Sequence, residues 1–216
     1  MVAGASKHGG PLCPIDGGGC TVVPGFVDPH THIVYSGDRL NEFELKIKGA
    51  EYLEILAAGG VIISTVEMTR AASFYELLEF ALKRLDKMLV CGTTTCEIKT
   101  GYGLDTETEL KMLRVIKRLK ESCPIAIKAT FLGAHAFPAE FKENHRGYID
   151  LIINEMLPKI AAENLADYID IFCERNYFSV EEMDEILRAG ISVGLKPKVH
   201  VNQFSAMGGV AKAVEL

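Results

Sequence analysis

The alternation of strand-type and helix-type segments is the feature that most constrains the fold of this chain. Short runs of apolar and β-branched residues predict five strands, near residues 22–27, 93–98, 125–132, 168–173 and 196–201. Apolar residues at helical spacing predict helices over 74–89, 110–119, 148–162 and 183–189, and another helix from residue 208 onward. Strands that alternate with helices form a parallel sheet with the helices outside. We therefore predict an α/β fold.

Three Ser/Thr-x-x-Glu pairs mark the expected starts of three helices. In such a capping box, each side chain bonds a free backbone N–H of the first helical turn. The pairs are Ser73 with Glu76, Thr106 with Glu109, and Ser179 with Glu182.

The predicted strands are enough for only part of a barrel. A complete (β/α)8 barrel takes about 250 residues, whereas this chain of 216 residues ends after the fifth strand and the start of a helix. We predict a partial TIM-type (β/α) barrel with about five of eight βα units, over residues 22–216. Residues 1–21 are rich in Gly, Pro and Cys and are expected to form an N-terminal loop or remnant. The long connection over 33–72 is expected to contain a helix at 51–58.

Composition excludes several classes of function. The chain is 48% hydrophobic and 24% charged, with a net charge of −6 and no long basic run, which disfavours nucleic acid as a partner. It has no run of about 18 apolar residues, so we expect no membrane span. The six cysteines form no Cys-x-x-Cys motif, and no signal-peptide core precedes residue 20. These features favour a cytoplasmic protein.

Two histidines at the end of the first predicted strand suggest metal chemistry. His30 and His32 are separated by one residue, so in a strand their side chains point to the same face. Two imidazoles on one side of a strand end are able to bind one divalent metal. A His-x-His pair in an arbitrary loop is more often solvated, but here it follows an apolar run at the expected mouth of a β/α fold.

Polar residues also follow the other predicted strands. Active sites of β/α barrels lie at the carboxyl ends of the strands. The residues at these ends, besides the His30 and His32 pair and the nearby Arg39, are Glu97, Lys99, Tyr102, His135, Glu174, His200 and Gln203. The remaining histidines, His8 and His145, lie in polar stretches and are expected to be solvated.

Longer motifs resemble one enzyme family. The segments are Pro-Gly-Phe-Val-Asp-Pro-His-Thr-His at 24–32, Gly-Asp-Arg at 37–39, Asn-Glu-Phe-Glu at 41–44, Lys-Thr-Gly-Tyr-Gly-Leu-Asp at 99–105, Glu-Thr-Glu-Leu-Lys-Met-Leu-Arg at 107–114, and Phe-Leu-Gly-Ala-His at 131–135. Over residues 22–216 the chain resembles the imidazolonepropionases of the amidohydrolase superfamily. The first motif is shared by many amidohydrolases, whereas the segments at 99–105 and 107–114 are more specific.

The resemblance implies a function and a set of site residues. It implies metal-dependent hydrolysis of 4-imidazolone-5-propanoate to N-formimidoyl-L-glutamate, in histidine degradation. It implies that His30, His32 and His200 bind one Zn²⁺ or Fe³⁺ per chain, a choice that imidazole ligands leave open. It also implies that Arg39, Tyr102, His135 and Gln203 contact the substrate. The expected partner is this small molecule, and a homodimer is the candidate assembly.

The residue types suit this chemistry. The guanidinium of Arg39 offers a planar fork for a substrate carboxylate, although a surface ion pair with Asp38 or Glu42 is the alternative. Tyr102 lies between two glycines, which are expected to let the backbone approach a ligand closely. The amide of Gln203, the candidate catalytic residue, is able to orient a water or the leaving nitrogen but does not titrate as a base.

Differences from the family leave two alternative functions. The family continues past the fifth strand with a further histidine and a metal-binding aspartate, so the general base is expected to be absent and this chain alone to be weak or inactive. One alternative is another mononuclear amidohydrolase, such as a deaminase; the segment 169–174 has no lysine, which favours one metal over two. The other alternative is an inactive fragment that retains the fold.

Overall fold

A single parallel sheet organises the chain. The computed structural model describes residues 16–49 and 62–216. Their strands are β1 (Phe26–Thr31), β2 (Thr93–Lys99), β3 (Ala126–Ala134), β4 (Tyr168–Cys173), β5 (Lys196–Pro197) and β6 (His200–Val201). They pair in parallel in the order β1-β2-β3-β4-β5, with β6 also beside β4. Consecutive parallel strands in sequence order confirm the predicted α/β architecture of a partial β/α barrel.

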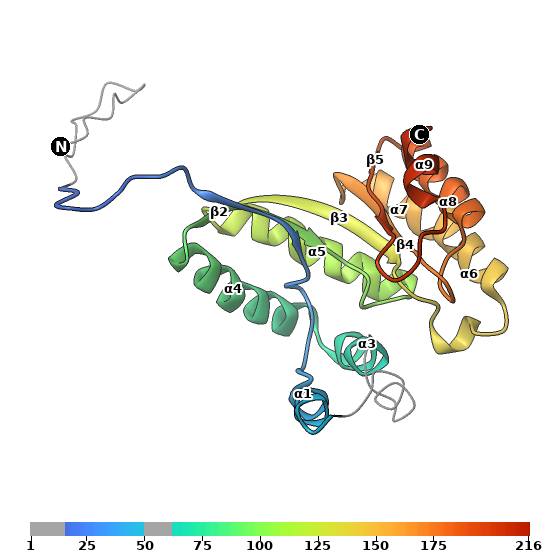
Figure 1. Cartoon of the computed structure of the whole chain (residues 1–216), viewed down its shortest axis with the longest axis horizontal. Helices are drawn as coiled ribbons and strands as arrows, with labels where there is room; N and C mark the ends of the chain where they lie inside the picture. The colour runs from blue at the N-terminus through green and yellow to red at the C-terminus, as the bar shows by residue number, and fades with distance from the viewer. Residues whose placement is uncertain (1–15, 50–61) are drawn as a thin grey trace.

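Helices connect the strands, and several of them pack against the sheet. They are α1 (Leu40–Ile47), α3 (Ile62–Ala71), α4 (Phe74–Val90), α5 (Thr106–Ser122), α6 (His145–Leu151), α7 (Leu157–Glu163), α8 (Val180–Ser192) and α9 (Gly209–Val214), with a 3₁₀ turn η1 (Ala139–Phe141) and a π-helical turn η2 (Ile152–Met156). In Figure 1, α4 and α5 lie side by side along β2 and β3. Within the described residues, no helix is both long and apolar enough to span a membrane.

The first strand begins later than predicted. The apolar run at 22–27 suggested a strand there, but β1 occupies Phe26–Thr31. Its pairing begins where Phe26 faces Thr93, the first residue of β2. Pro24 carries no amide donor, and a Cβ at Gly25 would overlap the side chain of Thr94. The later start places His30 within the strand instead of in the loop after it.

Two of the three predicted capping boxes are confirmed, and the third is wrong. The hydroxyl oxygens of Ser73 and Ser179 each accept a hydrogen bond from the amide of the third helical residue. Each serine in turn donates its own backbone N–H to the carboxylate of that residue. The N-cap of α5 is instead Asp105, which accepts from the amide of Thr108. The aspartate precedes Thr106 by one residue and has the stronger acceptor. Glu109 is therefore free of a capping role, and its carboxylate points elsewhere.

Two other predicted elements are interrupted. The helix predicted over 148–162 starts earlier, at His145, and contains the π-helical turn η2 between α6 and α7. The strand predicted over 196–201 is split into β5 and β6, which pair with different parts of β4. The helix predicted at 51–58 lies outside the described residues, and the division into segments 1–21 and 22–216 stays a prediction.

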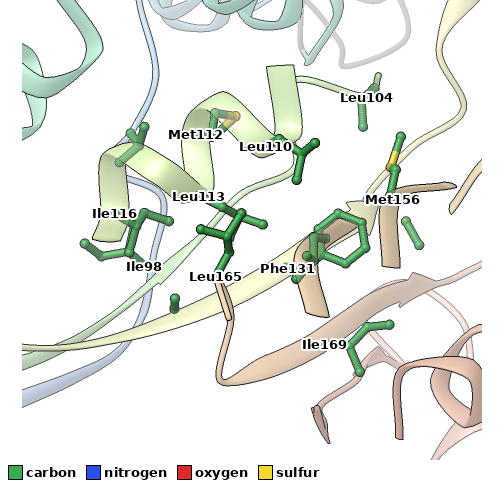
Figure 2. Close-up of a cluster of buried hydrophobic side chains, with 14 of the residues drawn as sticks. Ile98, Leu104, Leu110, Met112, Leu113, Ile116, Phe131, Met156, Leu165 and Ile169 are labelled. Atoms are coloured by element: carbon green, nitrogen blue, oxygen red, sulfur yellow. The ribbon is translucent and has the colours of Figure 1, made fainter. Parts of the chain in front are cut away.

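The hydrophobic core lies between the sheet and its helices. Figure 2 shows Leu113 and Ile116 of α5 close to Ile98 of β2, with Phe131 of β3 in the same cluster. All four side chains are buried. Cys96 and Ile98 belong to this core, whereas Glu97 and Lys99 alternate with them and lie on the opposite face of β2. The sheet therefore has one apolar face and one face with buried charges.

Truncation of a central core residue tests this packing. Leu113→Ala should lower the free energy of unfolding by about 2–5 kcal/mol, because it removes contacts between α5 and the sheet and leaves a cavity. Leu89→Ala is the matched control, since Leu89 is 38% exposed near the end of α4. Urea unfolding followed by circular dichroism measures both. Equal losses for the two variants would contradict the assignment of the core.

Candidate active site

All seven predicted site residues line one cavity. The carboxyl ends of the parallel strands meet at one edge of the sheet, where a cavity of about 300 Å³ opens. Its lining includes His30, His32, Arg39, Tyr102, His135, His200 and Gln203. A second cavity of about 300 Å³ shares His32, Arg39 and Tyr102 with the first. The order of the strands thus gathers residues that are far apart in the sequence, such as His30 and His200, which are 170 positions apart.

His30 and His200 face each other across the cavity. Their Nε2 atoms lie 3.1 Å apart. Nδ1 of His200 lies 2.9 Å from Oδ2 of Asp170, a buried carboxylate on β4. A carboxylate at the second ring nitrogen of a histidine is typical of the surroundings of a metal ligand. The register of β1 against β2 shifts between Asp28 and Thr31, and irregular pairing of this kind often re-aims a side chain beside a site.

Asp170 belongs to a cluster of buried charged side chains. Nζ of Lys99 lies 2.7 Å from Asp170 Oδ2 and 2.9 Å from Glu97 Oε1. Nζ of Lys198 lies 2.8 Å from the same Glu97 oxygen, and the hydroxyl of Thr130 also donates to it. Although burial opposes ionisation, Lys198, Thr130 and Lys99 hold the pKa of Glu97 below its usual range. Glu97 and Lys99, predicted at this strand end, therefore form an ion network beneath the cavity and do not line it.

Asp170 is the member of this network that contacts His200, and the sequence patterns did not predict it. It lies within the apolar strand Tyr168–Cys173, where it is 1% exposed. A single carboxylate inside such a strand is a signal, because buried charges are paired or bind metals.

His32, His135 and Tyr102 form the aromatic wall of the cavity. The rings of His32 and His135 are stacked with centroids 5.2 Å apart, and the ring of Tyr102 lies 5.0 Å from His32. Nδ1 of His135 lies 2.9 Å from the carbonyl oxygen of Gly101. Since a carbonyl only accepts, Nδ1 carries the proton and Nε2 is left as an acceptor. Burial lowers the pKa of His135 to about 4, so this ring is neutral at pH 7.

The histidine set has the properties of metal ligands. Burial and the neighbouring His200 lower the pKa of His30, and burial together with His135 lowers that of His32 well below the usual value. Neutral imidazole is the form that binds metals. Two nitrogens on a tetrahedral zinc would lie about 3.3 Å apart, close to the 3.1 Å between His30 and His200. Nδ1 of His32 is buried without a hydrogen-bond partner.

The three predicted ligands do not all converge. Across residues 16–49 and 62–216, no group of three His, Cys, Asp or Glu side chains is placed to hold a metal ion. The structure brings His30 and His200 together, whereas the ring centroid of His32 lies 5.9 Å from that of His30. The donor set fits a metal, and the full ligand set stays a prediction.

Arg39 and Gln203 lie at the rim of the cavity. The side chain of Arg39 is 42% exposed, and its Nη1 lies 4.0 Å from Oε2 of Glu42. This loose contact leaves the guanidinium on the cavity wall. Gln203 is exposed on the loop after β6. His145, predicted to be solvated, is exposed but stacks on Phe137 with centroids 3.7 Å apart, and His8 lies outside the described residues.

Glu174 fixes the loop that carries Gln203. Its carboxylate accepts hydrogen bonds from the amides of Phe204 at 2.9 Å and Ser205 at 3.1 Å, and from the hydroxyl of Ser205. It also accepts from the amide of Arg175. The Ser205 hydroxyl and these amides lower the pKa of Glu174 to about 2. The strand-end glutamate therefore positions a loop and does not line the cavity.

The depressed pKa of Glu174 predicts a pH dependence. The carboxylate contributes stability that is fully present above its unfolded pKa of about 4.3 and is lost as the pH falls toward its folded pKa of about 2. Glu174→Gln should therefore melt below the parent chain at pH 5, and the gap should close toward pH 2. Thermal unfolding by circular dichroism measures the gap. Glu181→Gln, at an exposed position on α8, should show no such gap, and a gap for Glu174→Gln that is constant with pH would contradict the assignment.

The chain is similar in sequence to known enzymes. The chain is 54% identical over 201 residues to the imidazolonepropionase of Flavobacterium johnsoniae, covering 93% of this chain and 49% of that protein. It is 53% identical over 211 residues to the imidazolonepropionase of Herpetosiphon aurantiacus, covering 94% of this chain and 49% of that protein. No protein-family model matches the sequence. The chain thus spans about half the length of the curated relatives it matches.

A solved structure supports the fold. The crystal structure of adenine deaminase from Arthrobacter aurescens superposes with a TM-score of 0.59 at 12% identity, over 89% of this chain and 62% of that chain. At this identity the likeness concerns the fold alone, and it confirms the predicted α/β partial barrel. The resemblance seen in the motifs is confirmed as well: over the half of their length that it spans, this chain is a homologue of the imidazolonepropionases.

Proposed function

We propose that this chain forms the metal-binding and substrate-binding strand ends of an imidazolonepropionase. The reaction is hydrolysis of 4-imidazolone-5-propanoate to N-formimidoyl-L-glutamate, a step of histidine degradation in the cytoplasm. The observation that carries the proposal is one cavity of about 300 Å³ that is lined by all seven site residues implied by the resemblance. Identity of 54% to an enzyme of this name supports it. A homodimer stays a prediction.

His30, His32 and His200 are the proposed ligands of one Zn²⁺ or Fe³⁺. When bound, the metal would polarise the ring amide and lower the pKa of a water. Asp170 orients the ring of His200 through its contact at Nδ1, and Lys99 holds Asp170 in place. These contacts fix which nitrogen of His200 faces the cavity.

The remaining cavity residues match the parts of the substrate. The guanidinium of Arg39 pairs with the propanoate carboxylate. Nε2 of His135 is an acceptor at pH 7, so it receives a hydrogen bond from a ring N–H of the imidazolone. The ring of Tyr102 packs beside this position, and the amide of Gln203 orients the attacking water or the leaving nitrogen.

Metal uptake tests the ligand set. Metal-free chain mixed with Zn²⁺ should bind about one ion per chain, because three histidines suffice for a catalytic zinc site. His30→Ala should abolish stoichiometric binding, measured by calorimetry and by elemental analysis after gel filtration. His145→Ala is the matched control, since His145 is exposed and stacks on Phe137 outside the cavity. Uptake unchanged in His30→Ala, or lost equally in His145→Ala, would contradict the assignment.

Substrate recognition tests the role of Arg39. The chain should bind the non-hydrolysable 3-(imidazol-4-yl)propanoate, and any ring opening of 4-imidazolone-5-propanoate by this chain alone should be weak and release no ammonia. Arg39→Lys keeps the charge but loses the planar fork, so binding should weaken about 10-fold or more. Arg146→Lys, on the exposed surface of α6, should bind as the parent does. Ammonia release, or equal binding by Arg39→Lys and the parent chain, would refute the proposal.

A further inference from the structure

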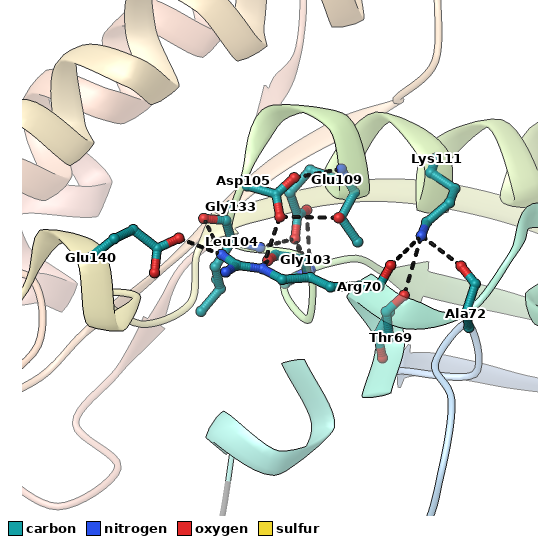
Figure 3. A network of polar contacts seen from close by, with 12 residues as sticks. Thr69, Arg70, Ala72, Gly103, Leu104, Asp105, Glu109, Lys111, Gly133 and Glu140 are labelled. Carbon is teal, nitrogen blue, oxygen red and sulfur yellow. Dashed lines mark hydrogen bonds and ion pairs between the residues drawn. The ribbon is translucent and has the colours of Figure 1, made fainter. Parts of the chain in front are cut away.

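Side chains bind the amides and carbonyls of Gly101, Gly103 and Leu104 in the loop at residues 100–105. This loop follows β2, precedes α5 and carries Tyr102 into the cavity. Figure 3 shows Glu109 and Arg70 converging on it from two sides. The loop is therefore held by side chains instead of being exposed to solvent, and these contacts help to fix the position of Tyr102.

Glu109 binds the amides of the loop. Its Oε1 accepts from Gly101 at 3.1 Å, from Gly103 at 2.8 Å and from Leu104 at 3.0 Å. Oε2 lies 3.2 Å from the amide of Gly101. The side chain is 0% exposed and stands in the first turn of α5, where the helix dipole favours a negative charge. One carboxylate thus binds the residues on both sides of Tyr102.

Arg70 and His135 bind the carbonyls of the same loop. Nε of Arg70 donates to the carbonyl of Gly103 at 2.7 Å, and Nη2 donates to that of Leu104 at 3.2 Å. The carbonyl of Gly101 accepts from His135 at 2.9 Å. Both residues that flank Tyr102 therefore have their amides bound by Glu109 and their carbonyls bound by Arg70 or His135.

The two glycines around Tyr102 serve contacts within the protein. Gly101 has a φ of +100°, and a Cβ there would lie 2.8 Å from both Nδ1 of His135 and the carbonyl oxygen of Leu132. A Cβ at Gly103 would lie 2.7 Å from the amide nitrogen of Glu109. The structure thus gives these glycines a role within the protein, because they make room for His135 and the start of α5; their close approach to a ligand stays a prediction. Leu104 has a left-handed φ of +54°, which a non-glycine residue keeps only where its surroundings hold it.

We propose that Glu109 is a positioning residue that presents Tyr102 to the ring of the substrate. Its carboxylate holds the backbone on both sides of Tyr102, so that the tyrosine ring stays within 5.0 Å of His32 and 5.5 Å of His135, centroid to centroid. Glu109 lines neither cavity, so it acts through the loop and not on the substrate. The part about substrate rests on the proposed function, whereas the part about the loop stands on the structure alone.

The polarity of the contacts explains why a glutamate stands here. Oε1 accepts from three amides, Oε2 lies 3.2 Å from the amide of Gly101, and the hydroxyl of Thr100 also donates to the carboxylate. A glutamine would keep the first oxygen but would place an NH₂ group against the amide of Gly101. Glu109→Gln should therefore retain part of the arrangement, whereas Glu109→Ala removes all of it and leaves three buried amides without an acceptor.

Hydrogen exchange of the loop amides tests the positioning directly. By NMR, the amides of Gly103 and Leu104 should exchange at least about 10-fold faster in Glu109→Ala, with an intermediate rate in Glu109→Gln. The nuclear Overhauser contact between the rings of Tyr102 and His135 should weaken in the same order. In the same variants, affinity for 3-(imidazol-4-yl)propanoate should fall about 10-fold in Glu109→Ala and be partly rescued in Glu109→Gln, while Zn²⁺ uptake changes less than about 2-fold.

Two controls separate positioning from general destabilisation. Leu119→Ala removes a buried side chain near the far end of α5 and should lower stability without faster exchange at Gly103 relative to other core amides. Glu107→Ala, an exposed acid on the same turn, should leave all readouts unchanged. Unchanged exchange in Glu109→Ala, or equal effects of Glu109→Ala and Leu119→Ala on the loop, would overturn the proposal. If the parent chain binds no imidazole propanoate, the proposed function fails, and the exchange and Overhauser data still decide the role of Glu109.

Discussion

A lysine ammonium buried between two carboxylates is the interaction on which the candidate site depends. Lys99 is 3% exposed and bonds Glu97 on its own strand and Asp170 on β4. Removing one member of such a buried group leaves the others as uncompensated charges, at a cost of about 3–5 kcal/mol. Since Asp170 also contacts His200, the network joins the ionic interior of the sheet to the predicted metal ligands. The position of His200 on β6 is thus linked, through Asp170 on the neighbouring strand β4, to the charges of β2.

Two further carboxylates give the site its shape without lining it. Glu109 binds the loop of Tyr102, and Glu174 binds the loop of Gln203. In both cases an acid accepts from backbone amides that would otherwise face water or remain unpaired. Loops at strand ends have few backbone partners of their own, and a buried carboxylate supplies several acceptors at one point. The two loops are therefore fixed by side chains, as the strands are fixed by their neighbours.

The sequence patterns predicted which residues lie at the strand ends for two reasons. Apolar runs locate the strands, and a parallel sheet brings their carboxyl ends to the same edge. The strand at 93–98 and its neighbours follow from β-branched runs, and consecutive parallel strands bring their carboxyl ends together. The start of β1 was misplaced because pairing with Thr93, and not apolar character, sets where Phe26 begins the strand. The Thr106 and Glu109 spacing predicts a cap at Thr106, but it does not show that Asp105, one residue earlier, starts the helix by accepting from the amide of Thr108. Asp170 meets Lys99, 71 positions away, only in the folded sheet, and Glu109 reaches the amide of Gly101, 8 positions before it, only because the loop before α5 folds back over its carboxylate.

The tight fit of Gly103 against the start of α5 has a consequence for variation of this site. A Cβ at Gly103 would lie 2.7 Å from the amide nitrogen of Glu109, so a longer or rotated loop would displace the start of the helix. A change of preferred substrate is thus easier to reach by exchanging the side chains at the cavity wall than by remodelling the segment that presents Tyr102. Substitutions should accordingly be poorly tolerated at Gly103 and at the start of α5, although these positions do not contact a ligand. An assay of folding alone would not distinguish them from ordinary core positions.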